Sequence, residues 1–275
     1  PVREPIREEQ WLKHLDPLFE SLGAKRPAEM KEVYKSFLQD TAMLETLLEL
    51  RPEVVTFHFG VPPPETVTRL KETGIYTMGT ATNLQEALII QNLGIDAIVA
   101  QGMEAGGHRG VFDADAEDEK LSTMVLVKML SQNMRIPIVA AGGIMDGHMA
   151  KAMVDVGASA VQLGTAYILC PESGANSGYR EDLKSSRNQS TQFTAVYSGH
   201  PARGMVTDFI RYCSTLETPP TAAYPLTYDA TKQLHAAEPD GQYKYAPHWA
   251  GQGAPLVREM GAEDLTRLIV REMGF

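Results

Sequence analysis

The chain has 275 residues, of which 43% are apolar and 22% charged, and its 25 basic and 35 acidic residues give a formal net charge of −10. This is ordinary globular composition, which excludes disordered, collagen-like and disulfide-scaffold proteins. The acidic balance argues against a nucleic-acid-binding surface and against a polybasic membrane anchor. The length fits either two ordinary domains or one α/β barrel.

The chain carries no sign of secretion or membrane insertion. Its two cysteines, Cys170 and Cys213, are too few for a stapled secreted fold and fit a reducing compartment. No run of 18 apolar residues predicts a transmembrane helix, and residues 1–9 lack the apolar core of a signal peptide. We therefore expect an intracellular, cytoplasmic protein. The first residue is Pro rather than Met, which fits either a sequence that lacks its upstream residues or a natural remnant.

The first fifty residues predict helices. Apolar residues recur at helical spacing over residues 8–22 and stop at Gly23, while Pro17 predicts a kink or a break. A similar spacing continues over residues 27–50. We interpret residues 1–50 as a helical segment that packs on something larger.

Strands and helices then alternate. Short, continuous apolar runs predict five strands, at residues 53–60, 75–79, 96–100, 136–140 and 158–163. Such runs are typical of a parallel sheet that is covered on both faces. Residues that could bind a ligand or take part in catalysis follow directly after the strands, at the edge where α/β proteins bind ligands.

The alternation ends after residue 170. Residues 171–188 are polar, residues 194–204 contain a short strand, and helices are predicted near 231–237 and 262–273. We interpret residues 51–170 as the sheet domain and residues 171–275 as a C-terminal subdomain of helices and loops that covers it.

The strongest candidate for chemistry is the stretch 100–110, Ala-Gln-Gly-Met-Glu-Ala-Gly-Gly-His-Arg-Gly. Its four glycines in nine residues allow the backbone to approach a ligand closely. His108 is a titratable group suited to proton transfer near neutral pH. A flexible loop whose histidine only binds backbone is the alternative.

Two later strand ends suit a phosphate group. Gly142-Gly143 can present backbone N–H groups, aided by the dipole of the helix that follows, although a plain tight turn is equally compatible. Gly164 permits close approach at the next strand end, where the hydroxyl and N–H of Thr165 can also bind phosphate.

Other residues are weaker candidates. His58 could line a pocket or be a satisfied core histidine, and His200 lies in a turn. The acidic run 113–119 fits a solvated loop better than a metal site, so no metal is expected. The chain has no early Gly-x-Gly-x-x-Gly, which argues against a Rossmann nicotinamide site.

The stretch 100–110 resembles the signature loop of the nitronate monooxygenases, formerly called 2-nitropropane dioxygenases. Further stretches agree with this family in order and spacing, at residues 56–60, 138–144, 161–167 with 171–173, 198–204 and 249–253. The resemblance covers residues 50–275.

This resemblance implies a TIM-barrel-type (β/α)8 fold that holds FMN. Carried over by motif, the implied flavin contacts are Gln101, Gly106, Gly143, Gln162, Leu163, Gly164 and Thr165. His108 is the implied catalytic base or the electrostatic partner of the nitronate. The implied reaction is oxidation of an alkyl nitronate or nitroalkane by O2 to a carbonyl compound and nitrite, with no nucleic-acid or membrane partner. The oligomeric state stays open, with a homodimer as one option.

One departure from the family is marked. No strand is predicted before Glu53, so we expect a barrel that lacks its first strands. Two alternatives to a nitronate monooxygenase therefore stay open. The first is another FMN barrel oxidoreductase, such as an NADH:quinone reductase or an enoyl-thioester reductase. The second is a non-catalytic remnant of a flavin barrel.

Overall fold

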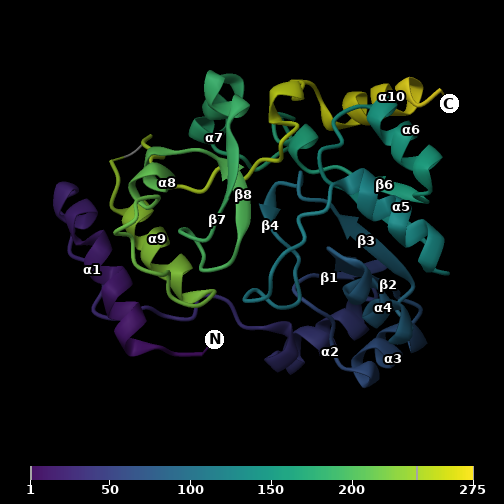
Figure 1. The fold of residues 1–275 in the computed structure, drawn as a ribbon, viewed down its shortest axis with the longest axis horizontal. Helices are drawn as coiled ribbons and strands as arrows, with labels where there is room; N and C mark the ends of the chain where they lie inside the picture. Colours follow the sequence, from purple (N-terminus) through teal and green to yellow (C-terminus); the bar gives the residue numbers. More distant parts are fainter. Residues whose placement is uncertain (1, 240, 275) are drawn as a thin grey trace.

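The structure, a computed structural model, describes residues 2–239 and 241–274. Its centre is a five-stranded parallel sheet in the order β1-β2-β3-β5-β6 (Figure 1). The strands are β1 (Val54–Phe57), β2 (Tyr76–Ala81), β3 (Ala97–Gln101), β5 (Ile138–Ala141) and β6 (Ala160–Gln162). They coincide with the five strands that the sequence predicts, so the α/β class with a parallel sheet is confirmed.

Four helices connect these strands and pack against them. They are α3 (Pro64–Glu72), α4 (Leu84–Asn92), α5 (Thr123–Asn133) and α6 (Gly147–Val156). Within the described residues the sheet is open, because β1 and β6 each pair on one side only. No strand precedes Val54 in the part of the chain that the structure describes.

Side-chain caps mark the start of three of these helices, α4, α5 and α6. The side chain of Asn83 accepts a hydrogen bond from the Glu86 N–H at 2.9 Å at the start of α4. The Glu86 carboxylate does not complete a reciprocal capping box. Instead it accepts from the N–H of Thr82 at 2.6 Å and from the N–H of Phe112 at 2.8 Å. A carboxylate on α4 therefore also anchors the long loop after β3.

The N-terminal fifty residues are less helical than predicted. Helix α1 (Pro5–Ser21) runs through Pro17, so the expected break is absent. After it, only η1 (Phe37–Gln39) and α2 (Thr41–Leu50) are helical, and the prediction of helix over residues 27–36 is wrong. The physical reason is that the apolar side chains serve two cores: Met30 packs beside Trp11, whereas Phe37 packs against the sheet cluster. One continuous helix could not reach both.

The C-terminal part forms a second layer. An antiparallel sheet joins β4 (Gly107–His108), β8 (Ala202–Met205) and β7 (Thr191–Thr194) in that order. It lies to the left of the parallel sheet in Figure 1. The helices of this layer are α7 (Ser177–Lys184), α8 (Asp208–Tyr212) and α9 (Leu226–Ala236), whereas α10 (Ala262–Glu272) lies beside α6 (Figure 1). Helices α9 and α10 confirm the two helices predicted near the C-terminus.

Two hydrophobic clusters account for most of the packing. One lies between the parallel sheet and its helices and includes Ile98 and Leu126. The other joins α1 to the C-terminal layer, where Trp11 packs with Phe209 and Leu234. Helix α1 thus packs on the C-terminal layer, whereas α2 packs on α3. The division of the chain at residues 50 and 170 stays a prediction.

Helix α10 packs on the start of α6 through Gly147. A Cβ at this position would overlap the Ile269 carbonyl oxygen and the Glu272 side chain. We expect Gly147→Ala to lower the free energy of unfolding by about 1–3 kcal/mol, as overpacking does, measured as a shift of the urea midpoint. Gly174→Ala is the matched control, because a Cβ there meets nothing within 4 Å. Equal midpoints for the two variants would contradict this packing argument.

Candidate active site

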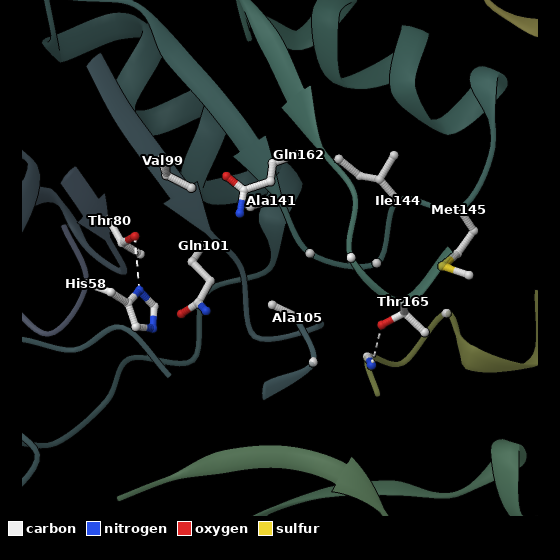
Figure 2. Close-up of a pocket in the computed structure, with 16 residues that line it drawn as sticks. His58, Thr80, Val99, Gln101, Ala105, Ala141, Ile144, Met145, Gln162 and Thr165 are labelled. Carbon is white, nitrogen blue, oxygen red and sulfur yellow. Dashed lines mark hydrogen bonds between the residues drawn. The ribbon is translucent and has the colours of Figure 1, made fainter. Parts of the chain in front are cut away.

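A cavity lies at the carboxyl ends of the parallel strands (Figure 2). It spans about 620 Å³, part of it open to solvent, and its wall includes residues of β2, β3, β5 and β6 together with His58, which directly follows β1. The lining residues are His58, Thr80, Val99, Gln101, Ala105, Gly106, Ala141, Gly142, Gly143, Ile144, Met145, Gln162, Gly164, Thr165, Gly251 and Gly253.

Glycines allow two chain segments to touch along one side of this cavity. A Cβ on Gly106 would lie 2.5 Å from the Gly251 nitrogen, and one on Gly251 would lie 2.6 Å from the Glu104 carbonyl oxygen. The segments are joined by a hydrogen bond from the Gln252 N–H to that same carbonyl at 2.9 Å. Gly251 also donates to the Thr165 hydroxyl at 3.0 Å (Figure 2). The loop after β3 is thereby tied to the end of β6.

The strand ends present unused backbone donors. Among the described residues, the N–H groups of Gly143, Ile144, Gly164 and Thr165 have no acceptor. Gly143 has a φ of +70°, a left-handed conformation that favours glycine. Successive N–H groups in such turns form concave sites that bind anions.

The start of α6 is not part of this donor set. The Asp146 side chain accepts from the Met149 N–H at 2.8 Å, and the Glu272 carboxylate accepts from the Gly147 N–H at 2.8 Å. Two carboxylates therefore occupy this helix N-terminus. The expectation that its dipole helps to bind a phosphate stays a prediction.

The Gln101 side chain, at the end of β3, holds the loop that carries His108. Its amide nitrogen donates to the His108 carbonyl at 2.9 Å, and its oxygen accepts from the Gly110 N–H at 2.7 Å. The His58 Nε2–H donates to the same His108 carbonyl at 3.2 Å. Because a carbonyl only accepts, the His58 proton is on Nε2, and its Nδ1 accepts from the Thr80 hydroxyl at 3.1 Å (Figure 2).

Arg109 anchors the loop that carries His108 through buried contacts of its side chain. Its side chain is 1% exposed and forms a two-point ion pair with Asp118, at 2.8 and 3.0 Å. It also donates to the Gln101 carbonyl oxygen. The interpretation of residues 113–119 as a purely solvated loop is therefore wrong at Asp118. The local sequence does not predict this pair, because the residues between Arg109 and Asp118 form a loop without a regular hydrophobic pattern.

The His108 ring lies among aromatic side chains. Its centroid is 5.4 Å from that of Trp249, 5.7 Å from those of Phe59 and Tyr224, and 6.0 Å from that of His200. Burial, followed by the neighbouring His200 and His58, lowers the pKa of His108 to about 4. The imidazole is consequently neutral at pH 7.

The structure brings most of the residues implied by the resemblance to one cavity. Its walls include Gln101, Gly106, Gly143, Gln162, Gly164 and Thr165. Leu163 does not line it, because its side chain packs into the hydrophobic core. His108 is not among the lining residues, but its carbonyl is bound by the side chains of Gln101 and His58, which do line the cavity, and its ring neighbours His200. The roles of all these residues stay predictions.

Several further residues at the site had little signal in the sequence. Gly251, Gly253 and Ser198 lie in stretches that resemble the family, but the motifs alone assign them no role. Thr80 and Met145 lie in no recognisable motif. Their positions at the cavity follow from the parallel register of the strands and from loop packing.

The described residues contain neither a membrane-spanning helix nor a cluster of metal-binding side chains. No helix in residues 2–239 and 241–274 is long and apolar enough to cross a membrane. Within the same ranges, no group of three or more His, Cys, Asp or Glu side chains is arranged to hold a metal ion.

Comparison with known proteins gives consistent matches. The sequence profile of the family described as nitronate monooxygenase matches residues 18–272. A nitronate monooxygenase from Pseudomonas aeruginosa is 47% identical over 271 residues, which cover 98% of this chain and 77% of that protein. One from Paraburkholderia phytofirmans is 47% identical over 267 residues, which cover 97% of this chain and 73% of that protein.

Solved structures agree. A nitroalkane oxidase from Streptomyces ansochromogenes matches with a TM-score of 0.89 at 33% identity, covering 100% of this chain and 78% of that one. FabK from Thermotoga maritima matches with a TM-score of 0.70 at 30% identity, covering 84% of this chain and 71% of that one.

The α/β fold with its parallel sheet matches the TIM-barrel flavoenzymes that these solved structures represent. The chain belongs to the nitronate monooxygenase family, whose members are flavin-dependent oxidoreductases. The family that the motifs predict is confirmed.

The ion pair under the loop has a measurable consequence. We expect Asp118→Ala to lower the free energy of unfolding by about 3 kcal/mol, because it leaves the buried Arg109 guanidinium without its counter-ion. Chemical denaturation measures this loss. Asp115→Ala is the control, since that side chain is exposed in the same loop. A similar stability for both variants would show that the pair contributes nothing.

Proposed function

We propose that this chain uses FMN to oxidise alkyl nitronates, or the parent nitroalkanes, with O2 to carbonyl compounds and nitrite. The observation that carries the proposal is 47% identity to two nitronate monooxygenases over nearly the whole chain. We further propose that the five parallel strands belong to a (β/α)8 barrel, which the match at a TM-score of 0.89 supports.

The cavity suits FMN in its chemistry. The free N–H groups of Gly143, Ile144, Gly164 and Thr165 are suited to the phosphate, as uncharged donors that need no basic side chain. The Gln162 side chain, which has no hydrogen bond to the described residues, is available to a polar edge of the ring system. Gln101 and Gly106 line the same cavity, and Leu163 can contribute only its backbone. When bound, FMN supplies the electron transfer between nitronate and O2.

His108 performs the proton chemistry in this proposal. A base must be unprotonated before it can accept a proton, and the buried His108 imidazole meets that condition at pH 7. With a neutral nitroalkane, it takes the α-proton. With a preformed nitronate no proton has to move, and the anion would itself favour the protonated imidazole by charge pairing.

A pair of assays tests the function. We expect the FMN-loaded protein to release nitrite from propyl nitronate under air and to show little NADH oxidation with a quinone. NADH turnover without nitrite would instead identify another flavin barrel oxidoreductase. A protein that stays colourless after incubation with FMN would be a non-catalytic remnant.

The role of His108 is tested by substitution. We expect His108→Asn to lower kcat/KM for neutral nitroalkanes by about 100-fold or more, the usual contribution of a general base. The same change should affect nitronates much less, because their α-proton is already gone. Initial rates of nitrite release with nitroethane and with ethyl nitronate measure the two values. Unchanged rates on both substrates would exclude a base role.

The cofactor contact at the end of β6 is tested separately. We expect Gln162→Ala to weaken FMN binding by about tenfold, which corresponds to the loss of one good hydrogen bond. Titration of the apoprotein with FMN, followed by fluorescence quenching, gives the Kd. Gln233→Ala, an exposed position on α9, is the control. Identical Kd values for the two variants would remove Gln162 from the cofactor site.

A further inference from the structure

Ser198 contacts the His108 ring, and the proposed function assigns no role to this serine. It is 0% exposed, and its Oγ lies 2.9 Å from His108 Nε2. The same oxygen lies 3.1 Å from the His200 carbonyl oxygen and 3.2 Å from the His200 backbone nitrogen. A buried hydroxyl therefore meets three polar groups, one of which belongs to the candidate base.

The number of donors and acceptors around Ser198 determines where its hydroxyl proton points and which His108 nitrogen is protonated. A serine hydroxyl has one proton to donate and two lone pairs that accept. The His200 N–H can only donate and the His200 carbonyl can only accept. The hydroxyl proton is therefore directed to the carbonyl, which has no other donor among the described residues. The remaining lone pair of Ser198 accepts from His108, so Nε2 carries the proton.

The opposite arrangement leaves a buried group unpaired. If Ser198 donated to an unprotonated Nε2, the His200 carbonyl would lose its hydrogen bond in a residue that is 7% exposed. Buried polar groups are rarely left without a partner. The ring surroundings agree with this reading, because His108 Nδ1 forms no hydrogen bond to any described residue and keeps a free lone pair.

We infer that Ser198 is a positioning residue, which holds the proton of neutral His108 on Nε2 and so leaves Nδ1 as the atom that accepts the substrate proton. In the step, the Cα–H bond of the nitroalkane breaks and the proton goes to Nδ1. The electron pair of that bond moves onto the nitro group and gives the nitronate. Nε2–H stays bonded to Ser198 throughout, which keeps the ring from turning as it becomes charged. This inference rests on the proposed base role of His108.

Imidazole nitrogen NMR tests the assignment without turnover. In ¹⁵N-histidine-labelled, FMN-loaded protein, long-range ¹H–¹⁵N spectra distinguish a protonated from an unprotonated ring nitrogen, and His108→Asn identifies the His108 signals. We expect Nε2–H in the wild-type protein and in Ser198→Thr, which keeps the hydroxyl. In Ser198→Ala we expect a shift toward Nδ1–H. Wild-type protein with Nδ1–H, or Ser198→Ala with an unchanged Nε2–H signal, would overturn the inference.

Kinetics provide the second readout. We expect Ser198→Ala to lower kcat/KM for nitroethane by about tenfold and for ethyl nitronate by less than about twofold, with Ser198→Thr restoring the nitroethane rate. Tyr197→Phe is the matched control, because it removes a neighbouring buried hydroxyl that bonds Thr207 rather than His108. Equal losses on both substrates would mark Ser198 as merely structural.

The two readouts separate the proposals. Wild-type protein that releases no nitrite would refute the proposed function, while the NMR spectra would still report the His108 tautomer. Should Ser198→Ala fail to fold, the wild-type tautomer and Ser198→Cys, whose thiol is a weaker acceptor, still decide the inference.

Discussion

The side-chain amide of Gln101 joins the parallel sheet to the loop that carries His108. It stands at the end of the central strand β3 and is buried, and both of its polar atoms bind backbone of that loop. Leaving such a buried amide unpaired would cost about 1–3 kcal/mol. The sheet therefore constrains where the loop lies, and the loop constrains the imidazole. The ion pair of Arg109 with Asp118 secures the same loop from its other side.

The cavity depends on how closely backbone segments can approach each other. Gly106 and Gly251 touch along one side of it, and no side chain could be accommodated at either contact. Near them, Gly143 and Gly164 have N–H groups without an acceptor among the residues that the structure describes. The result is a wall made of peptide groups, with fixed dipoles and no basic side chain. Such a wall can bind an anion while the chain keeps its strongly acidic overall charge.

Three histidines share the aromatic end of the site, and burial keeps them neutral. Burial is the largest cause that lowers the pKa of His58, of His108 and of His200. His58 and His200 each donate Nε2–H to a backbone carbonyl, of His108 and of Arg109 respectively. His58 and His200 thus hold the loop through Nε2, whereas Nε2 of His108 meets the side chain of Ser198.

The sequence by itself determined the α/β class, the five strands and their order along the chain. This was possible because continuous apolar runs and glycine-terminated helices are local signals that need no knowledge of distant contacts. The glycine–histidine loop, together with the ordered motifs, also identified the family correctly. The helix predicted over residues 27–36 failed for the converse reason, since Met30 and Phe37 pack into separate cores that local spacing does not reveal.

Only the tertiary structure decided how the site is assembled. Ser198 lies 90 residues after His108 along the chain, yet its hydroxyl is the hydrogen-bond partner of that ring. The sequence pattern places Asp118 in a solvated acidic loop, whereas the structure pairs it with the buried Arg109. The N-terminus of α6, promising as a phosphate site in the sequence, is occupied by Asp146 and by Glu272 from the far end of the chain. Each of these outcomes depends on which distant groups meet, and that is settled by packing rather than by local pattern.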